Sequence, residues 1–300
     1  MRRLATLLVV ALLGLSGCGT DGATTGSDGS RGDPASSAST IRRYVALGDS
    51  YTAAPYVYLT DVAGGCLRSS GNYPALLGAK LDVKHVDVSC SGATSKDLTG
   101  RQNTFQEQTV PPQLAAVTRD TDLVTVGIGG NDFGLFGSLV GTCPISGPQG
   151  RIFAPSEGVR CGQVDVRVAS ADVRRIGALV TRDLRAIHRK APEATVVLVG
   201  YPRILDPTRS CPKVLPVDRR DTVALNAVTR SLSQQMRSAA ERTGSVFVDL
   251  YAASKGHDAC AGKKAWVNGV RTDTGRAAAL HPFAEEQRAA AGLIAQAIDR

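Results

Sequence analysis

Residues 43–51 read RYVALGDSY, and this stretch decides the fold of the 300-residue chain. The run from Tyr44 to Leu47 has the composition of a buried β-strand, and Gly48-Asp49-Ser50 is turn chemistry directly behind it. A serine on a sharp turn at the carboxyl end of a buried strand exposes its hydroxyl where open α/β folds bind their ligands. Ser50 is therefore a candidate nucleophile. Alone the tripeptide is a weak signal, because the same residues form ordinary turns.

Other short runs rich in β-branched residues, each bounded by turn residues, predict further buried strands. They are Val83 to Val88, Leu123 to Ile128, Thr195 to Gly200 and Val246 to Leu250. Helical patterns lie between the runs, and alternating strands and helices predict a parallel sheet with helices on both faces. The sequence therefore predicts a three-layer α/β/α fold around a central, mostly parallel five-stranded sheet.

The clearest helical pattern has apolar residues at three- and four-residue spacing from Val173 to Ile187. A second helix is predicted from about Asp218 to Arg242, and a last one after Pro282, a residue suited to a first helical turn. The long Gly-rich segments from Gly134 to Gln163 and from Ser254 to Leu280 are expected to be loops that shape a substrate entrance.

Three elements beyond Ser50 complete a recognisable pattern. Gly92 follows the second predicted strand, Gly129-Gly130-Asn131-Asp132 follows the third, and His281 precedes the last helix. In these blocks and their order the chain resembles the SGNH hydrolases, the GDSL-type lipases and esterases. The resemblance runs from about Arg43 to the C-terminus and is strongest to secreted actinobacterial enzymes with three disulfides. It implies the flavodoxin-like SGNH fold and a carboxylic ester hydrolase.

The resemblance also implies a role for each block. Ser50 would attack an ester carbonyl and form an acyl-enzyme, with His281 as general base. The oxyanion would be met by the backbone N–H groups of Ser50 and Gly92 and by the side-chain amide of Asn131. Gly92 and the Asn131 block could otherwise be simple turns. A neutral histidine base predicts that kcat/KM falls in acid with an apparent pKa of about 6 to 7.

One member of the usual catalytic triad is missing from its expected place. SGNH hydrolases carry an aspartate three residues before the base, and that position is Ala278. A backbone carbonyl near Ala278 or Ala279 could orient the imidazole and fix its tautomer, although it supplies no charge. We therefore predict a Ser-His dyad, with Asp258 and Asp273 as possible substitutes for the missing acid.

Three other histidines compete for the role of base. His257 is the main rival, because it lies in a loop beside Asp258. His188, in an Arg-rich helical stretch, is most simply a surface residue, and His85, in a predicted strand, is most simply structural. His281 is preferred because it opens the last helix, which is where the base of an SGNH hydrolase lies.

The N-terminus has the pattern of an export signal. Arg2 and Arg3 precede an apolar run from Leu4 to Leu15 that is too short to span a bilayer. The run ends in Leu-Ser-Gly-Cys18, which resembles a bacterial lipobox and implies diacylation of Cys18; the alternative is a simple secretory signal with an incidental cysteine. Residues 1–18 are thus predicted to be a lipoprotein signal peptide, 19–40 a flexible Gly/Ser/Thr-rich tether and 41–300 the hydrolase domain. We expect an exported protein, held at the outer side of the cell membrane by Cys18.

The other cysteines lack the spacing of a zinc site, and export permits disulfides. Sequence alone leaves fifteen connectivities open. The resembling lipases pair neighbours in order, which implies Cys66 with Cys90, Cys143 with Cys161, and Cys211 with Cys260.

Composition narrows the partners. Without Arg2 and Arg3 the chain has 33 basic and 27 acidic residues, a net charge of +6 with no dense basic run, so nucleic acid is not expected as a partner. No metal or organic cofactor motif is present. We expect a monomer acting on lipid or simple acyl esters. The alternatives are an esterase or acyltransferase on acylated envelope polysaccharide and a non-catalytic binding lipoprotein on the same fold.

Overall fold

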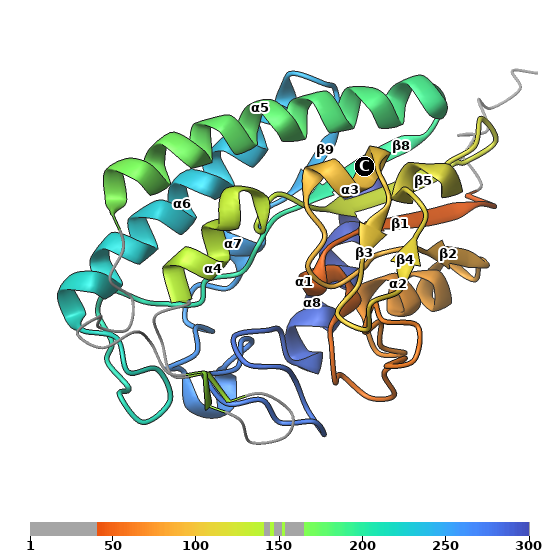
Figure 1. Ribbon diagram of the computed structural model, residues 1–300. Helices are drawn as coiled ribbons and strands as arrows, with labels where there is room; N and C mark the ends of the chain where they lie inside the picture. Colours follow the sequence, from red (N-terminus) through yellow and green to blue (C-terminus); the bar gives the residue numbers. More distant parts are fainter. Residues whose placement is uncertain (1–40, 141–144, 147–151, 154–164, 300) are drawn as a thin grey trace, which may run out of the picture. The chain divides into compact units, whose positions relative to one another are not determined.

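The central sheet has five strands in the order β2-β1-β5-β8-β9, and every neighbouring pair is parallel (Figure 1). β1 pairs with β5 along its whole length, from Tyr44 opposite Leu123 to Gly48 opposite Gly127. The strands are β1 (Tyr44–Gly48), β2 (His85–Asp87), β5 (Leu123–Gly127), β8 (Thr195–Val199) and β9 (Val246–Val248). The predicted three-layer α/β/α fold with a parallel five-stranded sheet is confirmed.

This computed structural model describes residues 41–140, 145–146, 152–153 and 165–299. Residues 41–300 form a compact unit by themselves. Its helices are α1 (Ser50–Ala53), α2 (Tyr73–Leu81), α3 (Ser95–Thr99), α4 (Leu135–Val140), α5 (Val166–Lys190), α6 (Arg219–Glu241), α7 (Leu250–Ala253) and α8 (Ala284–Ile298). Short 3₁₀ turns lie at η1 (Gln113–Ala116), η2 (Asp132–Gly134) and η3 (Gly262–Lys264), and small hairpins pair β3 (Gln102–Asn103) with β4 (Thr109–Val110) and β6 (Ile145–Ser146) with β7 (Ile152–Phe153).

Alternating side chains of β1 explain why the sheet is covered on both faces. Val45 and Leu47 belong to the cluster that includes the apolar stripes of α5 and α6, whereas Tyr44 and Ala46 pack with α2 and α8. Successive residues of a strand point to opposite faces, so a strand buried on both sides is apolar throughout. The long helices α5 and α6 lie side by side in Figure 1 and are in contact.

Several boundaries differ from the expectation. β2 is shorter than the predicted run, and the predicted loop after Gly134 begins with helix α4, which is too short to show a periodic pattern. Pro282 does not lie in the first turn of α8, because Phe283 is the N-cap; instead Pro282 forms a bridge with Val267. The segment from Ser254 to Leu280 is irregular apart from η3 and isolated bridges, as expected of a loop.

The sheet order places a topological switch at β1. From β1 the chain passes to β2 on one side and later to β5 on the other, so the crevice opens between the carboxyl ends of β1 and β5. Ser50 lies two residues after β1 and Asn131 four residues after β5. The topology therefore brings the two candidate site residues to the same edge.

Candidate active site

The turn that carries Ser50 is shaped by its glycine and its aspartate. A Cβ on Gly48 would lie 2.2 Å from Thr52 Oγ1 and 2.8 Å from the Gly127 carbonyl, so the close approach of β1, α1 and β5 requires glycine. Asp49 is the N-cap of α1, and its side chain accepts a hydrogen bond from the Tyr51 N–H at 2.9 Å. Ser50 is therefore held as the first residue of α1, at the edge of the sheet.

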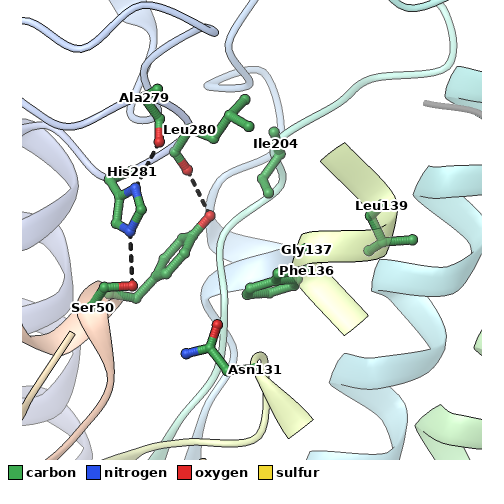
Figure 2. A pocket seen from close by; sticks show the side chains of 10 residues that line it. Ser50, Asn131, Phe136, Gly137, Leu139, Ile204, Ala279, Leu280 and His281 are labelled. Carbon is green, nitrogen blue, oxygen red and sulfur yellow. Dashed lines mark hydrogen bonds between the residues drawn. The ribbon is translucent and has the colours of Figure 1, made fainter. Parts of the chain in front are cut away.

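His281 contacts the Ser50 hydroxyl directly. Its Nε2 lies 2.7 Å from Ser50 Oγ, and its Nδ1 lies 2.7 Å from the Ala279 carbonyl oxygen (Figure 2). A carbonyl accepts only from a protonated nitrogen, so this contact places the proton of the neutral ring on Nδ1 and leaves Nε2 free to accept. The pair has the geometry of a hydroxyl and its general base.

No carboxylate orients His281 within the described part of the chain. Asp258 is buried and faces Arg209, whose guanidinium lies 3.3 Å from its Oδ2, while its Oδ1 accepts from the Cys260 N–H. Asp273 is exposed and caps its own turn by accepting from the Gly275 N–H. The carbonyl of Ala279 takes the place that an aspartate has in a triad.

Burial lowers the pKa of His281 below its ordinary value of 6.5, and the hydrogen bond to the Ala279 carbonyl opposes this shift. The charged imidazolium loses hydration in the cleft, and no anion of the described residues compensates for that loss. The resting ring is therefore neutral over a wider pH range than an exposed histidine, which is the state a base requires.

The competing histidines have other partners. His257 stacks on Trp266 with ring centroids 4.4 Å apart, and its Nδ1 is 2.7 Å from the Lys264 carbonyl. His188 Nε2 contacts Ser245 Oγ at 2.9 Å and is half-buried, so it is less of a surface residue than expected. His85 packs against Tyr44. Each of these rings has a structural contact away from Ser50.

Ser50, Gly92 and Asn131, the three candidate oxyanion donors, line the same cavity. Gly92 has φ +81°, a conformation that favours glycine, and it lines a cavity together with Ser50, Asn131 and His281. Neither the Ser50 N–H nor the Gly92 N–H donates a hydrogen bond to any other described residue. Asn131 Nδ2 donates to the Ala93 carbonyl at 3.0 Å, which fixes the amide beside Gly92. An amide nitrogen carries two hydrogens, so one remains for a ligand.

A buried aspartate and tyrosine connect the turns after β1 and β5. The Tyr201 hydroxyl donates to Asp49 Oδ2 at 2.5 Å and accepts from the Gly130 N–H at 2.8 Å. Burial raises the pKa of Asp49 to about 7, against the effect of the Tyr201 hydrogen bond. The network holds the block that carries Asn131 in fixed register with Ser50. Sequence analysis missed Tyr201, which is 152 residues from Asp49 and belongs to no motif.

Tyr51 connects the nucleophile turn to the loop of the base. Its hydroxyl donates to the Leu280 carbonyl at 2.7 Å, and the centroid of its ring lies 5.3 Å from that of His281. Leu280 has φ +62°, an unfavourable conformation for a leucine. The hydrogen bond from Tyr51 thus holds the residue before His281 in a conformation that it would not adopt alone. The quoted GDSY tetrad contains Tyr51, but nothing in the sequence indicates a partner 229 residues away.

Two cavities meet at Ser50, and both include Asn131 and His281. The first, about 180 Å³, is mainly apolar (Figure 2), and its apolar lining is Phe136, Leu139, Ile204 and Leu280. The second, about 280 Å³, lies on the side of Gly92 and mixes aromatic with polar groups, including Tyr56, Phe105 and Thr272. A reacting carbonyl at Ser50 would thus have an apolar compartment on one side and a mixed one on the other.

Comparison with known proteins identifies the family of this chain. Residues 46–289 match the family model of the GDSL-like lipase/acylhydrolase family. The chain belongs to this family. It is 35% identical to Lipase 2 of Streptomyces coelicolor over 221 residues, 72% of each chain, and 30% identical to an esterase of Streptomyces scabiei over 263 residues, 77% of this chain and 76% of the relative. This GDSL-family protein is a carboxylic ester hydrolase.

Solved structures show the same fold. The extracellular lipase of Streptomyces rimosus is 28% identical, with a TM-score of 0.69 over 85% of this chain and 99% of the other. A phospholipase A1 of Streptomyces albidoflavus is 26% identical, with a TM-score of 0.65 over 86% and 99%. Almost the whole S. rimosus chain thus corresponds to a part of this one, and residues 41–300 form a compact unit.

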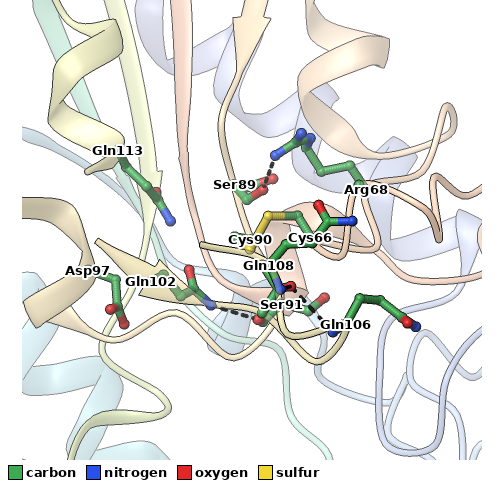
Figure 3. Close-up of a disulfide and its surroundings, with 12 residues drawn as sticks. Cys66, Arg68, Ser89, Cys90, Ser91, Asp97, Gln102, Gln106, Gln108 and Gln113 are labelled. Carbon is green, nitrogen blue, oxygen red and sulfur yellow. Dashed lines mark hydrogen bonds between the residues drawn. A yellow bond between two sulfur atoms is a disulfide. The ribbon is translucent and has the colours of Figure 1, made fainter. Parts of the chain in front are cut away.

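Two of the three expected disulfides of this GDSL hydrolase are confirmed, Cys66–Cys90 and Cys211–Cys260. Cys143 and Cys161 lie outside the described residues, as does Cys18. The first disulfide lies two residues before Gly92 and joins its loop to residues 54–70 (Figure 3). The same loop is held by the Ser91 N–H, which donates to the Cys66 carbonyl at 3.0 Å, and by Gln102 Nε2, which donates to the Ser91 carbonyl at 2.9 Å.

Two further properties concern ligands and membranes. Within the described residues, no three His, Cys, Asp or Glu side chains gather as a metal site would require. Among the helices described, none has both the length and the apolar character needed to cross a bilayer.

Proposed function

We propose that this GDSL hydrolase is an exported, membrane-anchored enzyme that cleaves acyl lipids or simple carboxylic esters through an acyl-enzyme on Ser50. The observation that carries the proposal is the 2.7 Å contact between His281 Nε2 and Ser50 Oγ, with Nδ1 fixed by the Ala279 carbonyl. The catalytic pair is a dyad, since the buried Asp258 and the exposed Asp273 have other partners.

In the acylation step, His281 Nε2 takes the hydroxyl proton while Ser50 Oγ attacks the ester carbonyl carbon. The carbonyl oxygen gains negative charge and is stabilised by the N–H groups of Ser50 and Gly92 and by the second amide hydrogen of Asn131. Collapse of the tetrahedral intermediate expels the alcohol, which receives the proton from His281. In deacylation, water replaces the alcohol, His281 takes its proton, and the acid leaves with Ser50 regenerated.

The substrate class is supported by the apolar cavity and by the relatives. Phe136, Leu139, Ile204 and Leu280 offer a compartment suited to an acyl chain. Relatives are named lipase and esterase, and one similar solved structure is titled phospholipase A1. We place the acyl chain in this cavity and the alcohol in the cavity beside Gly92.

Export is the part of the proposal that rests on the N-terminal sequence. Residues 1–18 are proposed as a lipoprotein signal that ends at Cys18, and 19–40 as the tether that carries the hydrolase domain, 41–300. The Cys66–Cys90 and Cys211–Cys260 disulfides support an oxidising compartment, and the S. rimosus relative is titled extracellular. Metabolic labelling with a palmitate analogue tests the anchor: wild-type protein should take up the label, and Cys18→Ala should not.

Covalent labelling tests the catalytic part. A fluorophosphonate should label the wild-type protein, and Ser50→Ala and His281→Ala should both lose the label. If Ser50→Ala is labelled as strongly as the wild type, Ser50 is excluded as the nucleophile. p-Nitrophenyl esters of increasing acyl length, with phospholipid and acetylated sugar alongside, then define the substrate; turnover of acetylated sugar alone would exclude the lipid assignment. A selective loss of kcat in Asp273→Asn, with Asp258→Asn as comparison, would show that the dyad is wrong.

A further inference from the structure

Two adjacent turns expose large apolar side chains near the cleft. Leu59 is 83% exposed, Phe105 71%, Tyr58 64% and Val62 45%. We refer to these four side chains as the apolar rim. Large apolar residues gathered on one surface mark a contact site more often than isolated ones do.

The two turns that carry the apolar rim are joined to each other. Phe105 lies in the turn between β3 and β4, and Gln108 of the same hairpin donates from Nε2 to the Ala63 carbonyl at 2.6 Å. A Cβ on Gly65 would lie 2.3 Å from Thr104 Oγ1, so the loop and the hairpin are in close contact there. Figure 1 shows the orange loop and the yellow hairpin as neighbours.

The exposure of Leu59 comes from a built loop. Thr60 and Ser69 form an antiparallel bridge, and the Ser70 N–H donates to the Leu59 carbonyl at 2.8 Å. The Cys66–Cys90 disulfide joins this loop to the loop of Gly92. The loop thus holds the Leu59 backbone in place while its side chain faces solvent. Because the backbone is already ordered, little conformational entropy is lost when the side chain binds a partner.

The apolar rim continues into the cleft. Phe105 belongs to both, and Tyr56, two residues before Tyr58, lines the cavity that contains Ser50 and Gly92. A surface that covers the rim would therefore lie across the mouth of the site. The exposed charged residues Asp61 and Glu107 lie beside the rim and are acidic. Binding at the rim is therefore not expected to depend on attraction between basic side chains and anionic lipid.

We propose that the apolar rim inserts into the surface of a phospholipid bilayer and places the cleft against it. The inference rests on the proposed function, because a hydrolase of membrane lipids must receive acyl chains from a bilayer. Tyrosine suits such a boundary, since its ring is apolar and its hydroxyl can stay in water. Insertion at the mouth gives the ester a path from the bilayer to Ser50.

The test uses residues 41–300, the compact unit that corresponds to almost the whole S. rimosus lipase chain, and flotation with vesicles of dialkyl phosphatidylcholine, whose ether bonds cannot be hydrolysed. We expect Leu59→Ser to weaken partitioning at least about fivefold and Val62→Ser about threefold, because each removes apolar surface from the lipid. The matched control is Val223→Ser, at an exposed valine of α6 that is 51% exposed, and it should partition as the wild-type fragment does.

Hydrolysis of soluble p-nitrophenyl acetate should stay within twofold of wild type in all three variants, which also shows that they fold. If Leu59→Ser and Val62→Ser bind vesicles as well as the wild type does, insertion of the rim is refuted. It is also refuted if the wild-type fragment binds only anionic vesicles and is released by salt. A dimer that Leu59→Ser converts to a monomer in sedimentation would also refute it, by making the rim a contact between copies. If the fragment cleaves no lipid ester yet needs Leu59 to bind vesicles, the proposed function is wrong and insertion of the rim into the bilayer is still supported.

Discussion

The hydrogen bond from Tyr51 to the loop of the base gives the sharpest prediction. Tyr51 and Leu280 are 9% and 4% exposed, so Tyr51→Phe leaves the Leu280 carbonyl buried without its partner while the ring still fills its space. Such a loss costs about 1–3 kcal/mol. In a chain of this size 1 kcal/mol lowers Tm by about 2–4 °C, so we expect a fall of about 2 to 12 °C.

The same change should affect turnover. Leu280, at φ +62°, would be free to relax, and His281 follows it directly in the chain. Small displacements of a catalytic group cost up to about 100-fold in rate, so we expect kcat to fall about 10- to 100-fold with KM little changed. Steady-state kinetics on a soluble p-nitrophenyl ester, with calorimetry for Tm, measure both effects.

Tyr73→Phe is the matched control. Tyr73 is 2% exposed and its hydroxyl contacts Thr52 Oγ1 at 3.2 Å, but among the described residues this hydroxyl makes no hydrogen bond to the loop of the base. Its loss should lower Tm and leave kcat within about twofold. The reasoning is refuted if Tyr51→Phe keeps wild-type kcat, or if Tyr73→Phe loses turnover equally, because the effect would then follow stability alone.

Three further outcomes are expected. Asn131→Ala should lower kcat by about 10² to 10³ with Tm nearly unchanged, and wild-type turnover would exclude its oxyanion role. Burial lowers the pKa of His281 below 6.5, and the neutral ring is the active form. We therefore expect kcat/KM to stay constant as pH falls to 6.5 and to decline only below that value. An acid decline of kcat/KM centred above pH 6.5 would contradict this. Burial raises the pKa of Glu286 from 4.5 to about 8, so between these values the native state keeps a proton that the unfolded chain releases, and stability falls as pH rises. Glu286→Gln cannot ionise and should flatten that part of a urea-unfolding series, whereas an unchanged series would show that another group is responsible.

The sheet and the main helices could be predicted because their signals are local. β1 is a continuous apolar run that ends in Gly-Asp-Ser, and α5 has an unbroken apolar stripe, so propensity, pattern and burial agree. The resemblance, not the spacing, gave the disulfide pairs, of which Cys66–Cys90 and Cys211–Cys260 are confirmed. Ser50 and His281 could be selected from the same resemblance.

The supporting groups could not be predicted because their partners are distant in the chain. Buried Gln113 accepts from the Gly48 N–H and donates to the Gly48 carbonyl, a pairing across 65 residues that no local pattern indicates. The hydrogen bond from Tyr201 to Asp49 could not be predicted for the same reason. Helix α4 has six residues and reads as loop sequence, although Phe136 and Leu139 line the apolar cavity.

The carbonyl of Ala279 has a consequence for how acid inhibits this hydrolase. A carboxylate that orients a histidine has a proton equilibrium of its own, coupled to that of the ring, whereas a peptide oxygen never ionises in the working range of pH. The Nδ1–H bond to Ala279 exists in both the neutral and the charged ring, so protonation occupies Nε2 without releasing the imidazole. Within the catalytic pair, acid should therefore act through a single proton on His281, and neutralisation should restore the neutral, oriented ring at once.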